Sequence, residues 1–202
     1  MKRMLSVFGV LTLLMLSAAA CAKAPQDEVN AAQADMDKAR AAQAEVWAPT
    51  EYKAADEALS AANAEIEAQN QKWMKNYDKA KELLARSREE AAKASQAAAA
   101  NKEQARKDAE AALQTADSAI QAAEAAWKVA PRTKDSKADL ELYKGDLETL
   151  KGALETARQA FASEDYKKAL ESATSVNDQA TSIATKLEDA KQKVAGRPVP
   201  KK

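Results

Sequence analysis

The sequence contains no histidine, one cysteine and only four glycines among its 202 residues. The common zinc sites use cysteine and histidine ligands, so this chain cannot assemble them. After the N-terminal region the glycines are Gly145, Gly152 and Gly196, which leaves no glycine-rich loop to cradle a phosphate. No set of nucleophile, base and electrophile can be assembled from the remaining residues. We therefore expect no catalytic residues, no metal and no cofactor, and a protein that is not an enzyme.

Neither sign of charge predominates, because 31 basic residues balance 31 acidic ones. A strong positive field is what recruits nucleic acid, and this chain has none. The charges are interspersed along an alanine-rich sequence, as expected for long solvent-exposed helices. We expect no nucleic-acid partner, and we interpret the acidic residues as solvated helix faces.

Long apolar runs are also scarce, and the longest lies at the N-terminus, from Met4 to Leu16. This run is shorter than the roughly 20 residues that span a bilayer core. Lys2 and Arg3 precede it and the small residues 17–20 follow it, which is the three-part order of a secretory signal. We predict a signal peptide over residues 1–20 and no transmembrane helix in the mature chain.

The single cysteine, Cys21, stands where signal cleavage would leave it as the first mature residue. Residues 1–21 resemble a bacterial lipoprotein precursor, in which the thiol takes a diacylglycerol, the signal is removed and the new amine is acylated. The resemblance implies lipidation of Cys21, with residues 21–26 as a lipidated linker, and several acyl chains would hold the protein stably on a membrane. Ala22 and Lys23 follow, without an aspartate at the second mature position. By resemblance to the enteric sorting rule, this favours the inner leaflet of the outer membrane, facing the periplasm. A simple secretory signal with an unmodified cysteine is the alternative.

Beyond the linker, apolar positions recur at alternating spacings of three and four residues, and no strand-like alternation competes with them. This spacing is typical of a coiled coil or an antiparallel helix bundle. We expect an all-α fold of long, alanine-rich, elongated antiparallel hairpins. The expected organisation is a helical region 27–130 with helices 27–47, 51–69 and 76–129, a connector 131–136, a hairpin 137–195 with helices 137–162 and 164–195, and an extended basic tail 196–202.

Prolines and small polar residues mark the expected helix ends. A continuous helix through "QNQKWMK" is the alternative to a break between residues 69 and 76. The first apolar series runs from Val29 to Val46. The expected stops are Pro49 and Pro131, and the expected N-caps are Thr50, Asp135 or Ser136, and Ser163.

Several stretches of the sequence look alike, which indicates an internal duplication. They are "YKAADEAL" from Tyr52, "YDKAKELL" from Tyr77, "YKKALESA" from Tyr166 and, more weakly, "YKGDLETL" from Tyr143. We interpret them as a duplicated two-helix hairpin. The turn "AFASEDYKKAL" also resembles, locally, the helix junctions of tetratricopeptide repeats.

Residues 27–100 resemble the bacterial envelope lipoprotein family catalogued as domain of unknown function 4398. The resemblance rests on "AP" before a helix, then "Y..A...L..A", then "Y..A..LL..A...A..A". It implies a helical envelope protein with no assigned reaction.

The aromatic residues cluster near the expected helix ends, while alanine predominates between them. Large side chains at these ends would fill the wider spaces of the bundle. An exposed aromatic patch that docks a partner is the alternative. The candidate residues for such docking are Trp47, Tyr52, Trp73, Tyr77 and Trp127.

Gly145 and Gly152 lie seven residues apart, on the face opposite the apolar series of their expected helix. Glycine inside a helix is less favourable than alanine by roughly 1 kcal/mol. A close helix neighbour on that face would explain both residues.

The leading functional hypothesis is a non-enzymatic, lipid-anchored periplasmic spacer or adaptor, with envelope proteins or further copies of itself as partners through its helix faces. A second hypothesis rests on the tail "PVPKK", which ends in Lys202. Alanine-rich heptads, a lipidated first residue and a C-terminal lysine resemble murein lipoprotein, which implies attachment of Lys202 to peptidoglycan; a solvated basic tail is the simpler alternative. A third hypothesis is a periplasmic holdase or accessory protein.

Overall fold

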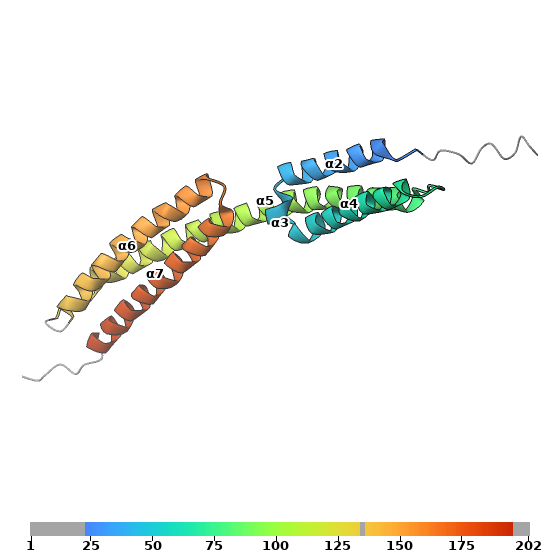
Figure 1. The fold of residues 1–202 in the computed structure, drawn as a ribbon. Coiled ribbons are helices and arrows are strands. Elements are labelled where there is room, and N and C mark those ends of the chain that lie inside the picture. The colour runs from blue at the N-terminus through green and yellow to red at the C-terminus, as the bar shows by residue number, and fades with distance from the viewer. Residues whose placement is uncertain (1–22, 134–135, 196–202) are drawn as a thin grey trace, which may run out of the picture. The chain divides into compact units, whose positions relative to one another are not determined.

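A computed structural model of the chain describes residues 23–133 and 136–195, and within these ranges it contains helices and no strand. The predicted all-α fold is therefore confirmed (Figure 1). The predicted signal peptide 1–20, Cys21, Asp135 and the tail 196–202 lie outside the described residues. The helices are α2 (Gln26–Ala41), α3 (Ala44–Trp47), α4 (Pro49–Asn70), α5 (Asp78–Val129), α6 (Lys137–Ala162) and α7 (Tyr166–Ala195).

The chain divides into two compact units between Asn101 and Lys102, inside α5. The sequence placed the boundary at the connector 131–136 instead. The division falls earlier because the first half of α5 packs on α2 and α4, whereas Ala116, Ile120 and other residues of its second half share a core with α6 and α7. One helix therefore contributes to two cores.

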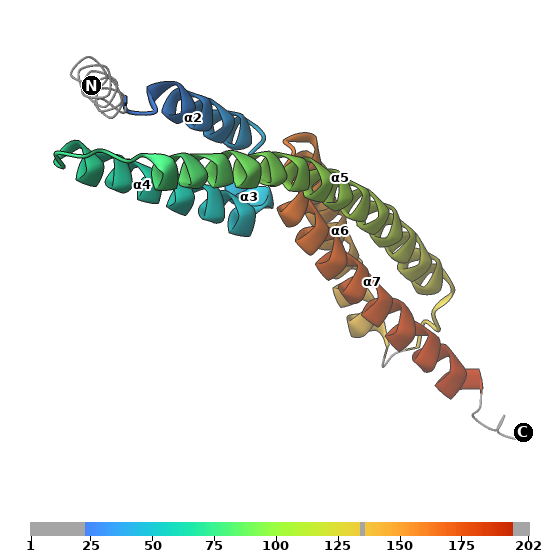
Figure 2. The same ribbon diagram turned by 90° about the vertical axis from the view of Figure 1, so that its right-hand side faces the viewer.

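In the first unit, α4 and α5 form a hairpin and α2 lies beside it (Figures 1 and 2). Alanines with no exposed surface occupy much of the core, and the larger buried residues include Met36 and Leu84. Alanine allows helices to approach closely, because its side chain adds a single methyl group to each facing surface. Ser87 is also fully buried, and its hydroxyl donates a hydrogen bond to the Ala55 carbonyl 2.9 Å away on α4. The polar group is thus satisfied inside the core.

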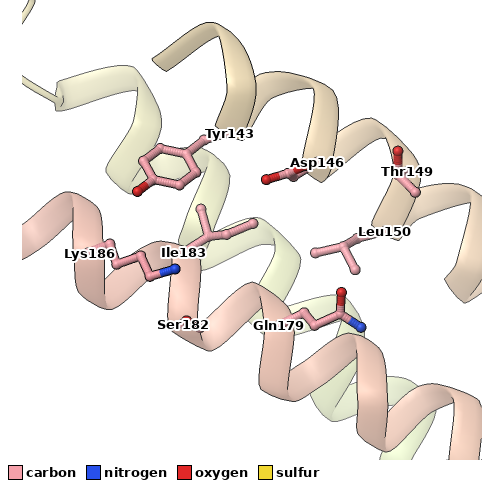
Figure 3. Close-up of a pocket in the computed structure, with 8 residues that line it drawn as sticks. All are labelled: Tyr143, Asp146, Thr149, Leu150, Gln179, Ser182, Ile183 and Lys186. Atoms are coloured by element: carbon pink, nitrogen blue, oxygen red, sulfur yellow. The ribbon is translucent and has the colours of Figure 1, made fainter. Parts of the chain in front are cut away.

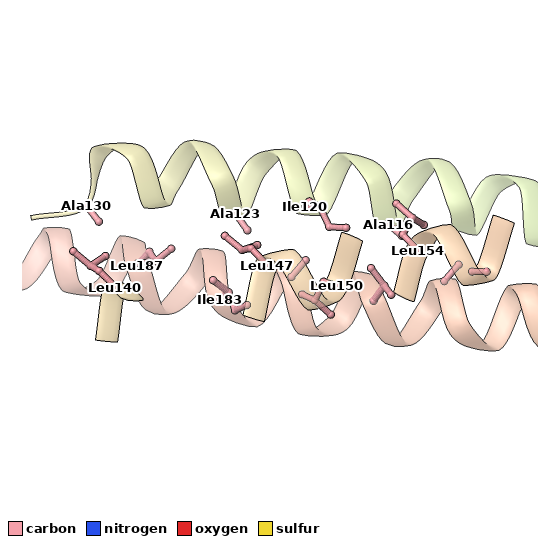
Figure 4. Packing of buried hydrophobic residues seen from close by; sticks show 14 residues of the cluster. Ala116, Ile120, Ala123, Ala130, Leu140, Leu147, Leu150, Leu154, Ile183 and Leu187 are labelled. Atoms are coloured by element: carbon pink, nitrogen blue, oxygen red, sulfur yellow. The ribbon is translucent and has the colours of Figure 1, made fainter. Parts of the chain in front are cut away.

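In the second unit, the end of α5 packs with α6 and α7 around larger side chains (Figure 4). Leucines of α6 face the core at spacings of three and four, as the sequence predicted. Alanines of α5 lie opposite them, so large residues of one helix meet small residues of another. The buried residues of α6 are Leu140, Leu147, Leu150, Leu154 and Ala157, and those of α7 are Tyr166, Ala169, Ala173, Val176, Ala180, Ile183 and Leu187.

The observed helices follow the predicted ranges closely, and the break between α4 and α5 is present, so the continuous-helix alternative is wrong. The predicted helix 27–47 is also wrong, because it is interrupted after Ala41. Gln43 there adopts the left-handed conformation, with φ 59°. The turn changes the helical phase, so that Ala44 and Trp47 are buried while Val46, placed in the apolar series, is 53% exposed.

One predicted helix stop and three predicted N-caps also differ, wholly or in part, from the structure. Pro49 begins α4 rather than ending a helix, because its missing N–H is not needed in a first turn, and Thr50 lies inside that turn. Ser136 occupies the N-cap position of α6, but its hydroxyl bonds the Pro131 carbonyl at 2.6 Å instead of capping the helix.

Ser163 ends α6 instead of starting α7, and its hydroxyl donates to the Gln159 carbonyl. The carboxylate of Asp165 accepts a hydrogen bond from the Lys168 N–H and caps α7 in its place. Glu164, between them, is left-handed with φ 61°. The backbone N–H groups of Glu164 and Asp165 bond the carbonyls of Phe161 and Ala160, which is a Schellman motif without the usual glycine.

Candidate functional site

The two residues predicted to be modified, Cys21 and Lys202, both lie outside the described residues. Lys23, two residues after Cys21, is the first described residue, and α2 starts at Gln26. The N-terminal end of α2 is therefore the part of this helix that lies nearest to Cys21 in the sequence.

Two of the five candidate docking aromatics are buried in the first unit. Trp47 is 9% exposed, and its carbonyl accepts a hydrogen bond from Asn101 Nδ2 at 2.7 Å. Tyr77 is 4% exposed, and its hydroxyl donates to Asn70 Oδ1 at 2.5 Å. Both fill helix ends, as the packing interpretation predicted, and neither is available to a partner.

Two further candidates are half-buried at helix ends. The Tyr52 hydroxyl accepts a hydrogen bond from the Arg40 guanidinium at 3.0 Å, and burial raises the pKa of this tyrosine. Trp127 donates its indole N–H to the Leu140 carbonyl at 2.8 Å, and the Arg132 guanidinium lies 4.9 Å from the centre of its ring. These contacts fix helix junctions and give both aromatics a structural role.

Trp73 differs from the other four, because its side chain is 99% exposed. It lies in the loop between α4 and α5, and the next residue, Met74, is 79% exposed. Lys72 and Lys75 flank the pair. We call residues 72–75 the tip loop. The interpretation of Trp73 as a core-filling residue is wrong, and the alternative of an exposed aromatic fits it.

The base of the tip loop is held by hydrogen bonds between the end of α4 and the two residues that precede α5. Gln69 is buried, and its amide oxygen accepts a hydrogen bond from the Asn76 N–H at 3.2 Å while its amide nitrogen donates to Glu65 at 2.7 Å. The Asn76 side chain accepts from the Asp78 N–H at 2.8 Å and so satisfies the first turn of α5. Together with the bond between Tyr77 and Asn70, these contacts fix both ends of the loop.

The start of α2 lies against the end of α4, close to the tip loop. Pro25 is buried there. A surface hollow between the two helices is lined by Ala24, Pro25, Gln26 and Val29 on one side and by Asn63, Ile66 and Glu67 on the other. Figures 1 and 2 agree that α2 begins at the end of the unit where α4 ends and α5 begins. The first described residues and the tip loop therefore occupy the same end of this unit.

The second unit has a shallow groove between α6 and α7, with a volume of about 260 Å³ (Figure 3). Ligand pockets typically measure roughly 300–1,000 Å³ and enclose most of their ligand. Leu150 and Ile183 are buried core residues of the two helices, so we interpret the groove as the surface of a helix junction. The lining residues are Tyr143, Asp146, Thr149, Leu150, Gln179, Ser182, Ile183 and Lys186.

The face of α6 opposite its leucines is open. A methyl group added at Gly145 or Gly152 would meet no atom within 4 Å, so the close helix neighbour that would explain both glycines is absent from the described residues. Leu142 on this helix is 61% exposed. The threonine hydroxyls of this face donate to their own helix: Thr149 bonds the Gly145 carbonyl and Thr156 the Gly152 carbonyl, both at 3.0 Å.

Charged side chains join the helices of the first unit at its surface. Asp35 on α2 accepts hydrogen bonds from Arg88 on α5 and from Lys38, each at 2.9 Å. Both bonds lower the pKa of the Asp35 carboxyl group, and the bond from Arg88 has the larger effect. Glu65 on α4 accepts from Gln69 and from Lys79 on α5, and these bonds lower the pKa of Glu65. Neither carboxylate adjoins a nucleophile, so we interpret both pairs as structural.

In the second unit, the Arg106 guanidinium lowers the pKa of Glu103 to about 2. Both residues lie on α5 and are solvent-accessible. Across the described residues, no group of three acidic or cysteine side chains is placed to hold a metal ion. No helix within 23–133 and 136–195 has the length and apolarity needed to cross a bilayer.

No protein-family model, no curated protein and no solved structure matches this chain.

Proposed function

We propose that this protein is a non-enzymatic lipoprotein of the bacterial cell envelope, anchored through lipids on Cys21 and acting as a periplasmic spacer or adaptor. The proposed location is the inner leaflet of the outer membrane. The observation that carries the proposal is the order of the first 21 residues, in which a positive start, a short apolar run and small residues precede the only cysteine.

The described chain supports this role in two ways. Helix α2 begins at Gln26, five residues after Cys21 in the sequence, so few residues separate the proposed anchor from the first unit. In both units the helices carry many solvent-exposed residues, and helix faces are a common means of recognition between proteins. A spacer or adaptor needs such surfaces and no reaction chemistry.

Mass spectrometry of the mature N-terminus tests the anchor. The full-length gene is expressed in a Gram-negative bacterium, and membranes are separated from the soluble periplasm. We expect the first mature residue to be Cys21 with diacylglycerol on its sulfur and an acyl chain on its amine. A Cys21→Ser variant should lack both additions. A mature chain that begins at Cys21 with a free thiol would contradict the proposal.

The adaptor role is tested by photocrosslinking in intact cells. A crosslinking amino acid at Gly145, where an added side chain meets no neighbouring atom, should capture an envelope protein or a second copy of this chain. The same amino acid at the buried Ala157 serves as the control and should capture none. Absence of any crosslinked product at exposed positions of both units would count against an adaptor.

Covalent attachment of Lys202 to peptidoglycan is a second candidate function, which rests on the resemblance of the alanine-rich helices and the predicted lipidated cysteine to murein lipoprotein. The test is to boil envelopes in detergent, pellet the sacculi and probe for the protein. If a fraction stays with the sacculi and deletion of Lys202 releases it, the protein is a covalent tether. If all of it dissolves, the anchored adaptor stands without that attachment.

A further inference from the structure

We infer that the tip loop, residues 72–75, is a second membrane contact that inserts Trp73 and Met74 into the lipid surface carrying the Cys21 anchor. The inference rests on the proposed lipid anchor and deepens it, because it names the protein surface that faces the membrane.

The first argument is the exposure of two large apolar side chains at adjacent positions in the sequence. Trp73 and Met74 are 99% and 79% exposed, whereas Trp47 and Tyr77 of the same unit are almost fully buried. A fully exposed tryptophan leaves roughly 150–250 Å² of largely apolar surface in water, and burial of that surface in lipid would be favourable.

The second argument is the chemistry of the flanking residues. Tryptophan is enriched at the level of lipid headgroups, because its ring is apolar and its indole N–H is polar. Lys72 and Lys75 stand on either side of the apolar pair. Lysine can lay its aliphatic stem along an apolar surface while its ammonium group reaches anionic headgroups. The loop therefore combines an apolar insertion with a positive rim.

The third argument is that the loop is presented on a fixed base. The bond from the Asn76 N–H to Gln69 and the bond from the Tyr77 hydroxyl to Asn70 join the two helix ends immediately behind the tip. A fixed base reduces the conformational entropy that an inserting segment loses on binding. The exposed pair is thus held away from the helices that could otherwise bury it.

The fourth argument is position. Pro25 packs at the end of α4, near Ile66, and the tip loop follows α4 at Asn70. The chain between Cys21 and Pro25 spans at most about 14 Å when extended. Lipids on Cys21 and the tip loop can therefore reach one membrane surface, at the same end of the first unit.

Fluorescence quenching by brominated phospholipids tests this contact. The full chain is purified from membranes in detergent and reconstituted in vesicles of phosphatidylethanolamine and phosphatidylglycerol at 3:1, with bromine on the acyl chains. We expect quenching of tryptophan emission in the wild type, and loss of most of that quenching in Trp73→Phe. Trp47 and Trp127 remain in the variant and report any quenching that does not come from the loop.

A charge variant tests the positive rim. In the variant Lys72→Gln/Lys75→Gln, we expect each removed lysine to lower the ratio of membrane-inserted loop to free loop about fivefold on these vesicles. The control Lys137→Gln/Lys144→Gln makes the same change in net charge on α6 and should leave the quenching of Trp73 unchanged. Circular dichroism establishes that each variant keeps its helical fold.

The outcomes separate the loop from the anchor. Lipid on Cys21 without quenching that depends on Trp73 would overturn the loop inference and leave the proposed function intact. Quenching at Trp73 in a chain that has no lipid on Cys21 would support the loop contact and overturn the proposed anchor. If Trp73 emission shifts to the blue in native membranes but not in pure lipid vesicles, a protein covers the loop and the lipid inference fails.

Discussion

At the scale of single residues, individual hydrogen bonds and ion pairs join the alanine-rich helices of the first unit. Ser87 lies fully buried among alanines and donates its hydrogen bond across to α4. Asp35 and Arg88 join α2 to α5 at the surface, 53 positions apart in sequence. Such pairs fix which helix faces meet, because alanine seams alone provide few distinguishing contacts.

The ion pair of Asp35 gives a prediction for the dependence of stability on pH. A lowered carboxyl pKa in the folded state means that the pair stabilises the fold above the unfolded-chain value of about 3.9, and that this contribution is lost as the pH falls through the folded-state pKa. We expect Asp35→Asn to lower the free energy of unfolding at pH 7 by roughly 0.5–1 kcal/mol. The difference in the free energy of unfolding between the wild type and Asp35→Asn should disappear as the pH falls below about 4.

Urea denaturation followed by circular dichroism, at several pH values, measures this difference. Asp37→Asn is the matched control, because Asp37 pairs with Arg40 of its own helix rather than with another helix. A gap between wild type and Asp35→Asn that is the same at pH 7 and pH 3 would contradict the assignment.

At the scale of elements, the helix ends are set by backbone geometry in places where the residue type gives little warning. Glu164 and Gln43 both adopt the left-handed conformation that usually selects glycine. Nothing in the chemistry of their side chains requires or predicts this backbone conformation. The turns are therefore maintained by the packing of the helices they connect.

Replacement of Glu164 by glycine should stabilise the second unit. The left-handed conformation is unfavourable for a residue with a Cβ by roughly 1–2 kcal/mol, and part of that gain is offset by the greater freedom of glycine in the unfolded chain. We expect a net increase of about 0.5–1 kcal/mol in the free energy of unfolding, even though the exposed ion pair with Lys102 is lost.

The neighbouring residue provides the control for this substitution. Ser163 is right-handed, with φ −88°, so Ser163→Gly should destabilise the unit or leave it unchanged. Thermal denaturation of both variants compares them directly. Equal shifts of Tm in the same direction would show that the left-handed conformation of Glu164 is not the cause.

The open face of α6 leads to a second prediction for this element. Gly145 and Gly152 lie in the interior of the helix with free space around them, so alanine fits at both positions. Each of Gly145→Ala and Gly152→Ala should raise the free energy of unfolding by about 0.8–1 kcal/mol, and the two effects should add. Denaturant titration of the two single variants and the double variant measures this. Destabilisation by either substitution would indicate that a close neighbour covers this face in solution.

At the scale of the whole molecule, two cores share one uninterrupted helix. The buried residues of α5 change partners near Asn101, where the first unit ends and the second begins. Each unit has its own hydrophobic core, so each can lose stability by itself.

Core overpacking in one unit tests this separation. Ala91 has no exposed surface, and Ala91→Leu should destabilise the first unit by about 1–3 kcal/mol. Hydrogen exchange should accelerate in residues 26–101 and change little in residues 137–195. Ala92→Leu places the same side chain on the exposed face of α5 and should leave exchange in both regions near the wild-type rates. Equal acceleration in both units by Ala91→Leu would mean that they unfold as one.

The sequence by itself determined the all-α fold, the seams of the four long helices and the interruption before α5, because these features follow from local periodicity and helix propensity. It also supplied the whole basis for the proposed lipid anchor. The tertiary structure decided where α2 is interrupted, where the chain divides, and which aromatics are buried. Trp73 and Trp47 are the same residue type near similar helix ends, yet one is exposed and the other is buried. Burial depends on which surfaces meet in space, and one-dimensional spacing does not contain that information.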